Sequence, residues 1–339
     1  MKKSLKILML FDCLQAHPRG YDFSAEFAEP DGLVYGQVRQ ALINNGHQVS
    51  LLGVCDDLQI IFDEVKENRP DLVFNLTDIF DDKSHLDKNV AWFLEMLGLA
   101  HTGASPANLL VCNNKALSKK ILSYHRIKVP NFHVFFRGHK VWKPSKLKFP
   151  VIVKPLKEEA SRGISQASFT DDEAGMVERI KFIHDSMSMD AIAEEYIEGR
   201  EFYVSVMGAK RTTVLPLREM KFGQMPEGGE RIATYRAKWD AAYRDKWGIK
   251  NVFAGRLPEG WEKKITEVCK RAFRALELKG YVRFDVRVTE VGQVYIIEPN
   301  ANPNLSRDDE FALSAEKSGI EYDALIQRIV DMGCQEIKN

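Results

Sequence analysis

The sequence predicts an α/β protein that starts with a parallel, helix-covered sheet and continues into two further lobes. The first third of the chain alternates short apolar strands with helices, which is typical of right-handed βαβ units. The last third holds two strands of alternating character joined by a short turn, which indicates an antiparallel hairpin. With 339 residues the chain is too long for one small core and favours two or three domains.

The first segment is expected to form a domain over residues 1–104. Its predicted strands are 6–11, 48–54 and 71–76, and its predicted helices are 33–45, 58–68 and 88–97. Ligands of parallel sheets lie beyond the carboxyl ends of the strands, so the polar loops 12–32 and 77–88 are candidate binding segments. Neither loop contains GxGxxG, so a Rossmann dinucleotide site is unsupported. A purely structural α/β domain remains the alternative for this segment.

The second segment, expected over 105–190, contains a predicted helix at 114–125 and strands at 132–136 and 149–155. Lys154 ends the last of these strands. A buried ammonium group is costly unless it meets an anion, although a lysine can also extend its ammonium into water. The loop that follows contains Ser161 and Gly163 and can bend over a phosphate.

The third segment, expected over 191–339, opens with two strands separated by Gly199. This arrangement suits a cleft hinge at which backbone groups and a carboxylate receive an adenine and a ribose. Further on, the strand 280–288 places Arg283, Asp285 and Arg287 on one face. A turn at 290–292 leads into the strand YIIEPN, and a helix is expected over 309–319.

The predicted hairpin brings three oxygen-bearing side chains together. Glu298 and Asn300 are two residues apart on extended backbone and share a face. Asp285 can lie beside them on the neighbouring strand. Carboxylate and amide oxygens suit Mg²⁺, which also takes phosphate oxygens as ligands. The sequence therefore predicts a magnesium–phosphate site, with a surface salt-bridge ladder as the alternative.

Composition restricts the remaining classes. Lys+Arg 48 against Asp+Glu 48 gives a formal net charge of zero, which argues against a broad nucleic-acid surface. No apolar stretch reaches transmembrane length and no signal-peptide cleavage site follows the start, so no membrane association and a cytoplasmic protein are expected. The five cysteines are scattered without a CxxC pair, which favours buried free thiols.

An ordered set of motifs resembles the ATP-grasp superfamily. The set is Lys115, VIVKP, EEYIEGREF, AKW, RFD and EPNANPN. The chain is most similar to the D-alanine–D-alanine ligase family, strongly from about residue 95 onward and weakly before it. The resemblance implies an N-terminal parallel βαβ (pre-ATP-grasp) domain followed by a two-lobed ATP-grasp fold. It also implies an ATP-dependent carboxylate–amine ligase, small amino-acid or amine substrates and a homodimer.

The resemblance also assigns roles to individual positions. Lys115 and Lys154 match lysines that contact ATP phosphates, and Lys238 matches a lysine on a mobile loop over the γ-phosphate. Arg283 matches the arginine that stabilises the tetrahedral intermediate, and Ser161 is the loop candidate for catalysis. The adenine and ribose segment is matched by Glu194, Glu195, Ile197 and Glu201. The ligands of two Mg²⁺ ions, with Mn²⁺ as a substitute, are matched by Asp285, Glu298 and Asn300.

The implied reaction has two steps: the first brings a carboxylate to the γ-phosphate of ATP, and the second forms the C–N bond. A carboxylate attacks the γ-phosphate and gives an acyl phosphate, and an amine then displaces phosphate. Lys154, Lys238 and Mg²⁺ would neutralise the first step, and Arg283 with a backbone N–H near Asn304 would receive the oxyanion of the second. Water must be excluded, so the segment 222–248, which opens with GQMPEGGE, is the expected lid.

Several positions depart from the family pattern. The N-terminal glycine-pair signature is not clearly present, and FSAEF offers only Ser24 and Glu26 as a loose match for the donor-amine site. A glycine-rich turn after the third strand is replaced by TDIFDDKSH, a substrate-binding serine by Ala160, and a tyrosine by Trp239. After NPN the family has glycine and later a Ser-Leu pair for the acceptor carboxylate. This chain has Asn304, Arg307, Asp308 and Asp309 as candidate substrate residues, followed by Glu310.

These acids would repel a carboxylate unless Arg307 offsets them, so free D-alanine is not the expected acceptor. The acids can instead face solvent in the first turn of the 309–319 helix and complement its dipole. Three alternatives in function remain open. They are an authentic D-alanine–D-alanine ligase, an ATP-grasp phosphotransferase of different chemistry, and a nucleotide-binding relative without catalysis.

Overall fold

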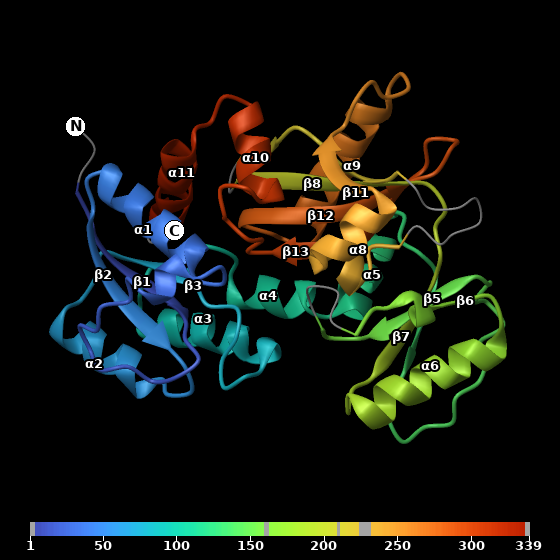
Figure 1. Ribbon diagram of the computed structural model, residues 1–339, viewed down its shortest axis with the longest axis horizontal. Coiled ribbons are helices and arrows are strands. Elements are labelled where there is room, and N and C mark those ends of the chain that lie inside the picture. Colours follow the sequence, from blue (N-terminus) through green and yellow to red (C-terminus); the bar gives the residue numbers. More distant parts are fainter. Residues whose placement is uncertain (1–3, 159–162, 209–210, 224–231, 336–339) are drawn as a thin grey trace.

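The computed structural model describes residues 4–158, 163–208, 211–223 and 232–335 (Figure 1). Their strands form three sheets that follow one another along the chain. Figure 1 shows the parallel N-terminal sheet at one end, the large antiparallel sheet above and the four-stranded sheet below it at the other end. This arrangement confirms the predicted fold class, a parallel α/β unit followed by antiparallel lobes.

The N-terminal sheet is parallel with strand order β2-β1-β3. Its elements are β1 (Lys6–Asp12), α1 (Leu33–Asn44), β2 (Gln48–Val54), α2 (Gln59–Glu67), β3 (Leu72–Leu76) and α3 (Asp87–Met96). Successive residues of β1 point to opposite faces, so Ile7 and Met9 pack toward α1, whereas Leu8 and Leu10 pack toward α2 and α3. The predicted strands and helices of this segment are confirmed, and their ends move by no more than one residue.

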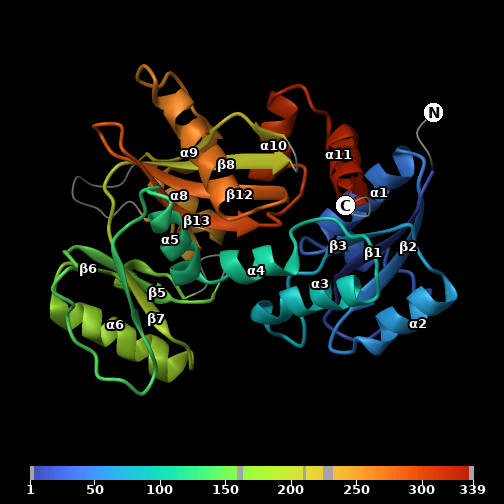
Figure 2. The same ribbon diagram turned by 180° about the vertical axis from the view of Figure 1, so that it is seen from behind.

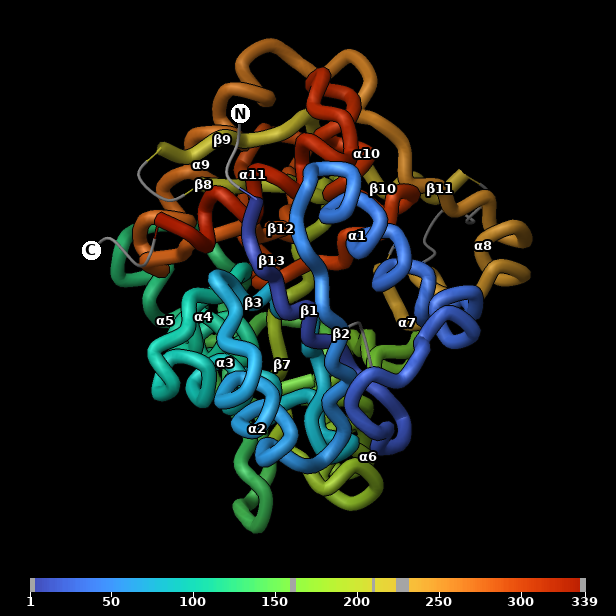
Figure 3. The backbone as a smooth tube through the Cα atoms, turned by 90° about the vertical axis from the view of Figure 1, so that its left-hand side faces the viewer, coloured from blue at the N-terminus to red at the C-terminus, as the bar shows by residue number. Residues whose placement is uncertain are grey.

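The C-terminal helix α11 (Tyr322–Gln335) returns to this first sheet. It lies beside α1 (Figures 1 and 3) and buries Leu325 and Ile329 in the same core as Ile7. The side chain of Asn45, at the end of α1, donates to the Asp323 carbonyl at 2.8 Å. The last segment therefore shares its core with the first, although the two are separated by most of the sequence.

The second sheet is antiparallel with strand order β4-β7-β5-β6. Its elements are β4 (Phe132–Phe135), β5 (Val151–Pro155), β6 (Phe169–Thr170), α6 (Glu173–Ser186) and β7 (Ala191–Glu195). Helix α6 covers one face through Met176, Ile180 and Ile183. Because β7 pairs with β4 and β5, this sheet extends through Glu195, beyond the boundary expected at 190.

The third sheet is antiparallel with strand order β11-β10-β8-β12-β13, and β9 pairs with β8. Its strands are β8 (Arg200–Gly208), β9 (Thr212–Val214), β10 (Arg218–Phe222), β11 (Ile249–Phe253), β12 (Gly280–Val288) and β13 (Val294–Ala301). Phe202, Val204 and Phe284 pack against α9 (Trp261–Ala275) on one face. The alternate residues of β8 and β12 face the other way. Met207 and Tyr281 pack there in the core of the first sheet, whereas Glu201, Asp285 and Arg287 line a cavity shared with the second sheet.

The remaining helices connect these layers. They are α4 (Pro106–Cys112), α5 (Lys115–Tyr124), α7 (Tyr235–Trp239), α8 (Ala241–Trp247), α10 (Glu310–Lys317) and the short 3-10 helices η1 (Glu26–Ala28), η2 (Ser84–Leu86) and η3 (Gln166–Ser168). Figure 2 shows α4 running between α3 and α5. Ser105 and Asn114 cap α4 and α5 by accepting from the backbone N–H groups of Asn108 and Leu117. Among the described residues, no helix is long and apolar enough to cross a membrane.

Candidate active site

Asp285 and Glu298 lie opposite each other in the β12–β13 pair. The same register places Arg283 opposite Asn300, and the Asn300 side-chain amide donates to Asp285 Oδ1 at 3.0 Å. The three side chains predicted to form a magnesium site therefore converge on one face of the third sheet. The hairpin that the sequence predicted is present, with β12 at 280–288 as expected.

A β-bulge at Ile297 gives β13 this orientation. Asp285 pairs with Glu298, but the next residue, Val286, pairs with Ile296, so Ile297 is the additional residue. Before the bulge Ile296 is buried, and after it Pro299 is buried. Without the extra residue Glu298 would follow Ile296 into the core, because residues two apart share a face. The bulge therefore turns Glu298 and Asn300 toward the cleft.

Cations surround the two carboxylates. Lys115 Nζ lies 2.9 Å from Glu298 Oε1, and Asp285 contacts Arg283 Nε at 2.8 Å and Lys238 Nζ at 3.3 Å. Burial opposes ionisation of Glu298, but Lys115 and Lys154 outweigh it and lower its pKa to about 2. The ion pairs expected for a salt-bridge ladder, the alternative to a magnesium site, are therefore present. They lie in a cleft and not on an open surface.

These residues fit a divalent cation that is shared with phosphate. Within the described part of the chain no three His, Cys, Asp or Glu side chains converge as ligands. Two carboxylates and one amide oxygen are an incomplete hard-oxygen set, and phosphate oxygens and water would complete it. The neighbouring ammonium groups would then lie close to the same phosphates.

Lys154 ends β5 with its side chain buried, and its ammonium meets an anion as expected. Its Nζ lies 3.0 Å from Glu194 Oε2, and Lys119 Nζ lies 3.0 Å from Glu194 Oε1. The side chains of Lys119, Lys154 and Glu194 are at most 5% exposed. The carboxylate of Glu194 is thus directed at two lysines, and any contact of this residue with an adenine has to accommodate that arrangement.

A first cavity, here called the hinge pocket, lies between the second and third sheets at the residues that join β7 to β8. Its apolar wall contains Ile152, Ile164, Ile197, Ile232 and Ile297. At its polar end are Lys154, Lys238, Asp285 and Glu298, and Glu194, Glu195 and Glu201 also line it. An apolar slot that ends in cations and carboxylates matches a flat ring system carrying phosphates.

The side chains of two hinge-pocket glutamates are occupied by protein contacts. Glu195 accepts from Asn131 Nδ2 and from the Lys148 backbone N–H, both at 2.9 Å. Glu201 pairs with Arg287 Nη2 at 2.7 Å. The sequence pattern placed Arg287 on the same strand face as Asp285, as observed, but indicated no role for it. The Glu195 N–H also donates to the Asn131 carbonyl, at 2.9 Å, so the expected backbone contact with adenine would use the Glu195 carbonyl.

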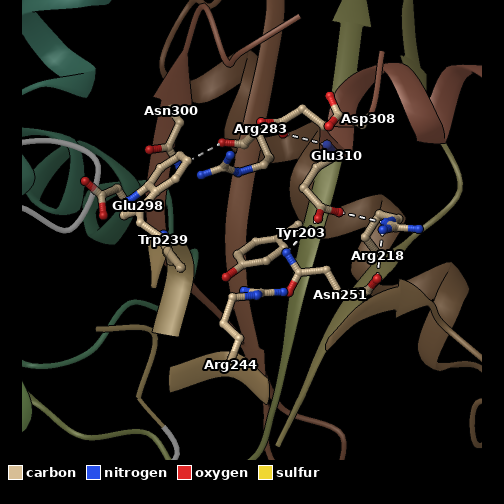
Figure 4. A pocket seen from close by; sticks show the side chains of 12 residues that line it. Tyr203, Arg218, Trp239, Arg244, Asn251, Arg283, Glu298, Asn300, Asp308 and Glu310 are labelled. Atoms are coloured by element: carbon tan, nitrogen blue, oxygen red, sulfur yellow. Dashed lines mark hydrogen bonds and ion pairs between the residues drawn. The ribbon is translucent and has the colours of Figure 1, made fainter. Parts of the chain in front are cut away.

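A second cavity of about 310 Å³, here called the arginine pocket, lies beyond Glu298. Figure 4 shows Arg218, Arg244 and Arg283 around it together with Tyr203 and Trp239. The remaining lining residues are Lys238, Asn251, Glu298, Asn300, Asp308, Asp309 and Glu310. Lys238 and Glu298 line both cavities, so the two pockets meet at the predicted magnesium site.

The acids after NPN both line the arginine pocket and begin α10. Asp309 caps the helix by accepting from the Glu310 N–H at 2.5 Å. Burial raises the pKa of Asp309 although Arg283 opposes this. Glu310 is buried and pairs with Arg218 Nε at 2.7 Å, and it accepts from Asn251 at 2.7 Å. Asp308 is exposed. The three acids therefore line the arginine pocket and also begin α10, and of the three only Asp308 faces solvent as the alternative expected.

Three predicted substrate residues lie elsewhere or remain bound locally. Arg307 pairs with Asp323 at 3.4 Å and stacks on Tyr322. It does not line the arginine pocket, where Arg218 pairs with Glu310. The side chain of Asn304 accepts from Ser306. Glu26 accepts from the Tyr21 hydroxyl at 2.8 Å. Ser161, Ala160 and the QMPEGGE part of the lid opening, residues 224–230, lie outside the described residues.

The described part of the expected lid contains α7 and α8. Thr234 caps α7, which carries Lys238, and Asp240 caps α8, which carries Arg244. Arg244 donates to the Ala237 carbonyl at 2.6 Å and so ties the two helices together. Sequence reasoning missed Arg244, Arg218 and Lys119. Only Lys119 had a readable signal, because it follows Lys115 by one helical turn.

Comparisons with known proteins agree with this geometry. The family model described as "D-ala D-ala ligase C-terminus" matches residues 121–331. The fold is that of an ATP-grasp enzyme, and the chain is an ATP-dependent ligase that forms C–N bonds. The chain belongs to the D-alanine–D-alanine ligase family.

Individual relatives are distant. Protein y4sG of Sinorhizobium fredii is 29% identical over 89% of this chain and 88% of its own length. The D-alanine–D-alanine ligase of Pelotomaculum thermopropionicum is 25% identical over 81% of this chain and 84% of its own length.

Among solved structures, the Bacillus anthracis D-alanine–D-alanine ligase complexed with ATP superimposes with a TM-score of 0.74 at 19% identity, over 99% of each chain. The VanG D-Ala:D-Ser ligase of Enterococcus faecalis superimposes with a TM-score of 0.71 at 18% identity, over 98% of this chain and 100% of the VanG chain. At these identities the structures share the fold.

Proposed function

We propose that the protein joins a carboxylate to an amine with ATP and Mg²⁺, through an acyl phosphate, and releases ADP and phosphate. The observation that carries this proposal is the meeting of two cavities at Lys238 and Glu298. A ligase of this kind must hold a nucleotide on one side of the transferring phosphate and two organic substrates on the other. The family membership and the solved ATP complex of a relative support the nucleotide.

In this proposal the hinge pocket takes ATP. Its isoleucine wall packs on the adenine, the Glu195 carbonyl accepts from the exocyclic amino group, and the Ile197 N–H donates to a ring nitrogen. Glu201, oriented by Arg287, receives a ribose hydroxyl. Lys115, Lys154 and Lys238 surround the phosphates, where their charges offset the repulsion between γ-phosphate and attacking carboxylate.

Asp285, Glu298 and Asn300 would hold two Mg²⁺ ions, which supply charge neutralisation on the transferring phosphoryl group. When the carboxylates take up this role, Lys115 and Lys238 lose their partners at Glu298 and Asp285 and become available to phosphate oxygens. Arg283 lies beside the same carboxylates and lines the arginine pocket. It would stabilise the oxyanion that forms when the amine attacks the acyl phosphate.

The arginine pocket would take the acceptor, and its charge pattern disfavours free D-alanine. Glu310 is neutralised by Arg218, but Asp308 and Asp309 carry no such ion pair among the described contacts. An acceptor carboxylate placed about 4 Å from one of them would be repelled by about 1 kcal/mol where water screens the pair, and by about 4 kcal/mol at an effective dielectric of ~20. An acceptor with a second cationic group, or with its carboxylate masked, would be favoured.

The direct test is phosphate release from ATP, screened over pairs of amino acids and amines, with mass spectrometry of the products. The proposal predicts ADP, phosphate and an amide product with an amine-rich or carboxyl-blocked acceptor. Authentic D-alanine–D-alanine synthesis is the second candidate, because the family and its named relatives favour it. Efficient formation of D-alanyl-D-alanine would establish that alternative. ATP hydrolysis or transfer without an amide product would contradict both ligase assignments.

A further inference from the structure

A group of three charged side chains lies at the wall of the hinge pocket. Lys154 and Glu194 line the pocket, and Lys119 lies behind them. Lys119 and Lys154 share the single carboxylate of Glu194, with Nζ–Oε distances of 3.0 Å each. The side chain of Lys119 is 1% exposed, so it does not reach solvent. Lys119 is absent from the lining of both cavities, so its influence on a bound nucleotide must pass through its neighbours.

Lys119 is held from two sides. Besides Glu194 on β7, its ammonium donates to the carbonyl of Ile297, the bulge residue of β13. It therefore links the strand of the second sheet that carries Glu194 to the strand of the third sheet that carries Glu298. Burial and the neighbouring Lys154 lower the pKa of Lys119 to about 8, against the pull of Glu194 and Glu298. At neutral pH most molecules therefore keep the proton.

The arrangement matters because Lys154 would otherwise have Glu194 to itself. A carboxylate paired with one lysine cancels that lysine's charge, whereas a carboxylate shared between two lysines leaves a net positive charge. Removing a charged partner in a buried site is not locally compensated, because water is excluded. The charge that Lys154 offers to a phosphate therefore depends on Lys119.

We propose that Lys119 is a positioning residue for the ATP site, which engages one side of the Glu194 carboxylate and so keeps Lys154 cationic toward the phosphates of the nucleotide. This inference rests on the proposed use of the hinge pocket for ATP. It adds a residue that touches neither nucleotide nor metal. Its signature is specific: the charge of Lys154 acts on phosphate groups and has no effect on the adenine ring.

The experiment compares the affinities of ATP and adenosine by titration calorimetry on the full chain, and uses the ratio of the two as the readout. Lys119→Met should lower this ratio about tenfold, as expected for the loss of roughly one effective charge near the phosphates. Lys119→Arg, which keeps the positive charge, should retain most of the parent's ratio of ATP affinity to adenosine affinity. Lys120→Met, at the exposed neighbouring position, is the matched control and should leave the ratio unchanged.

The second part of the experiment removes the shared carboxylate. Lys119→Met combined with Glu194→Gln should restore the ratio, because no carboxylate remains to cancel Lys154. Glu194→Gln alone should keep the ratio at or above that of the parent, which preserves the test if Lys119→Met does not fold. A general packing role would weaken ATP and adenosine together and would not be rescued.

The outcomes separate the inference from the proposed function. Failure of the parent to bind ATP at all would overturn the proposed function. Binding by the parent with an unchanged ratio in Lys119→Met, or a reduced ratio in Glu194→Gln alone, would overturn the inference and leave the ligase assignment standing.

Discussion

Asp285 and Glu298 are direct cross-strand partners. The bulge at Ile297, the residue before Glu298, turns Glu298 out of the core. A partly buried carboxylate that Lys115 and Lys154 keep ionised is suited to hold a metal ion that also binds the phosphates of ATP. The predictions below start from this pair.

Glu298→Ala should reduce turnover by at least about 10²-fold, because phosphate charge in a water-poor cleft would lose its metal ligand. The measurement is ATP-dependent phosphate release at saturating Mg²⁺. Glu290→Ala, in the exposed turn of the same hairpin, is the control and should behave as the parent. Full Mg²⁺-dependent activity in Glu298→Ala would remove the metal assignment.

The two phosphate-site lysines should differ in their kinetic effects. Lys154→Ala should weaken nucleotide binding by about tenfold or more, whereas Lys238→Ala, on the lid helix α7, should lower kcat more than affinity. Nucleotide titration and steady-state kinetics separate these effects. Lys157→Ala, at an exposed position after β5, is the control. If both Lys154→Ala and Lys238→Ala matched the parent, the two lysines would be structural.

Asp309→Ser should improve the use of free D-alanine as acceptor by about tenfold, because it removes one repulsive carboxylate. Serine is also a good N-cap, so α10 should remain intact. The measurement is kcat/KM for D-alanine beside a carboxyl-blocked amine, with Glu316→Gln on the exposed side of α10 as control. Efficient use of D-alanine by the parent, with no gain in Asp309→Ser, would contradict the charge argument.

The stability of the N-terminal sheet should respond to the ionisation of Asp12. Burial raises the pKa of Asp12 to about 7, although the N–H groups of Asp78 and Ile79 oppose this. Between pH of about 4 and about 7 the folded chain keeps a proton that the unfolded chain has released, so this contribution to stability falls as the pH rises.

Asp12→Asn should therefore gain stability relative to the parent between pH 5 and pH 8, by roughly 2 kcal/mol after allowance for partial solvent exposure. Urea unfolding at the two pH values measures this difference. Asp185→Asn, at an exposed position on α6, is the control. A constant difference between Asp12→Asn and the parent across this range would show that Asp12 ionises normally.

The sequence predicted those parts of the structure that depend on local periodicity. The alternation in 280–288 put Arg283, Asp285 and Arg287 on one face, and the hairpin turn made Asp285 a neighbour of Glu298. The strands and helices of the first sheet follow from the same type of pattern. Helices α4, α6, α7, α8 and α9 were not assigned, and the return of α11 to the first sheet could not be read from spacing.

The parts that escaped prediction are pairings between distant segments. Arg307 is adjacent to the acids in sequence and was the only counterion considered for them, but the order β11-β10-β8 brings Arg218 and Asn251 to Glu310 instead. The partner of Lys119 was equally hidden, because Glu194 reaches it from another sheet. The bulge at Ile297 has no sequence signature, although it determines which way Glu298 points.

The central claim is that a carboxylate attacks the γ-phosphate of ATP in this cleft. It is tested most directly with amino acids labelled with ¹⁸O in the carboxylate, supplied as a D- and L-amino-acid mixture with hydroxylamine as the acceptor. The account predicts ADP, a hydroxamate and inorganic phosphate that carries one ¹⁸O atom from the carboxylate. Phosphate without label, or the release of AMP and pyrophosphate, would contradict an acyl-phosphate ligase.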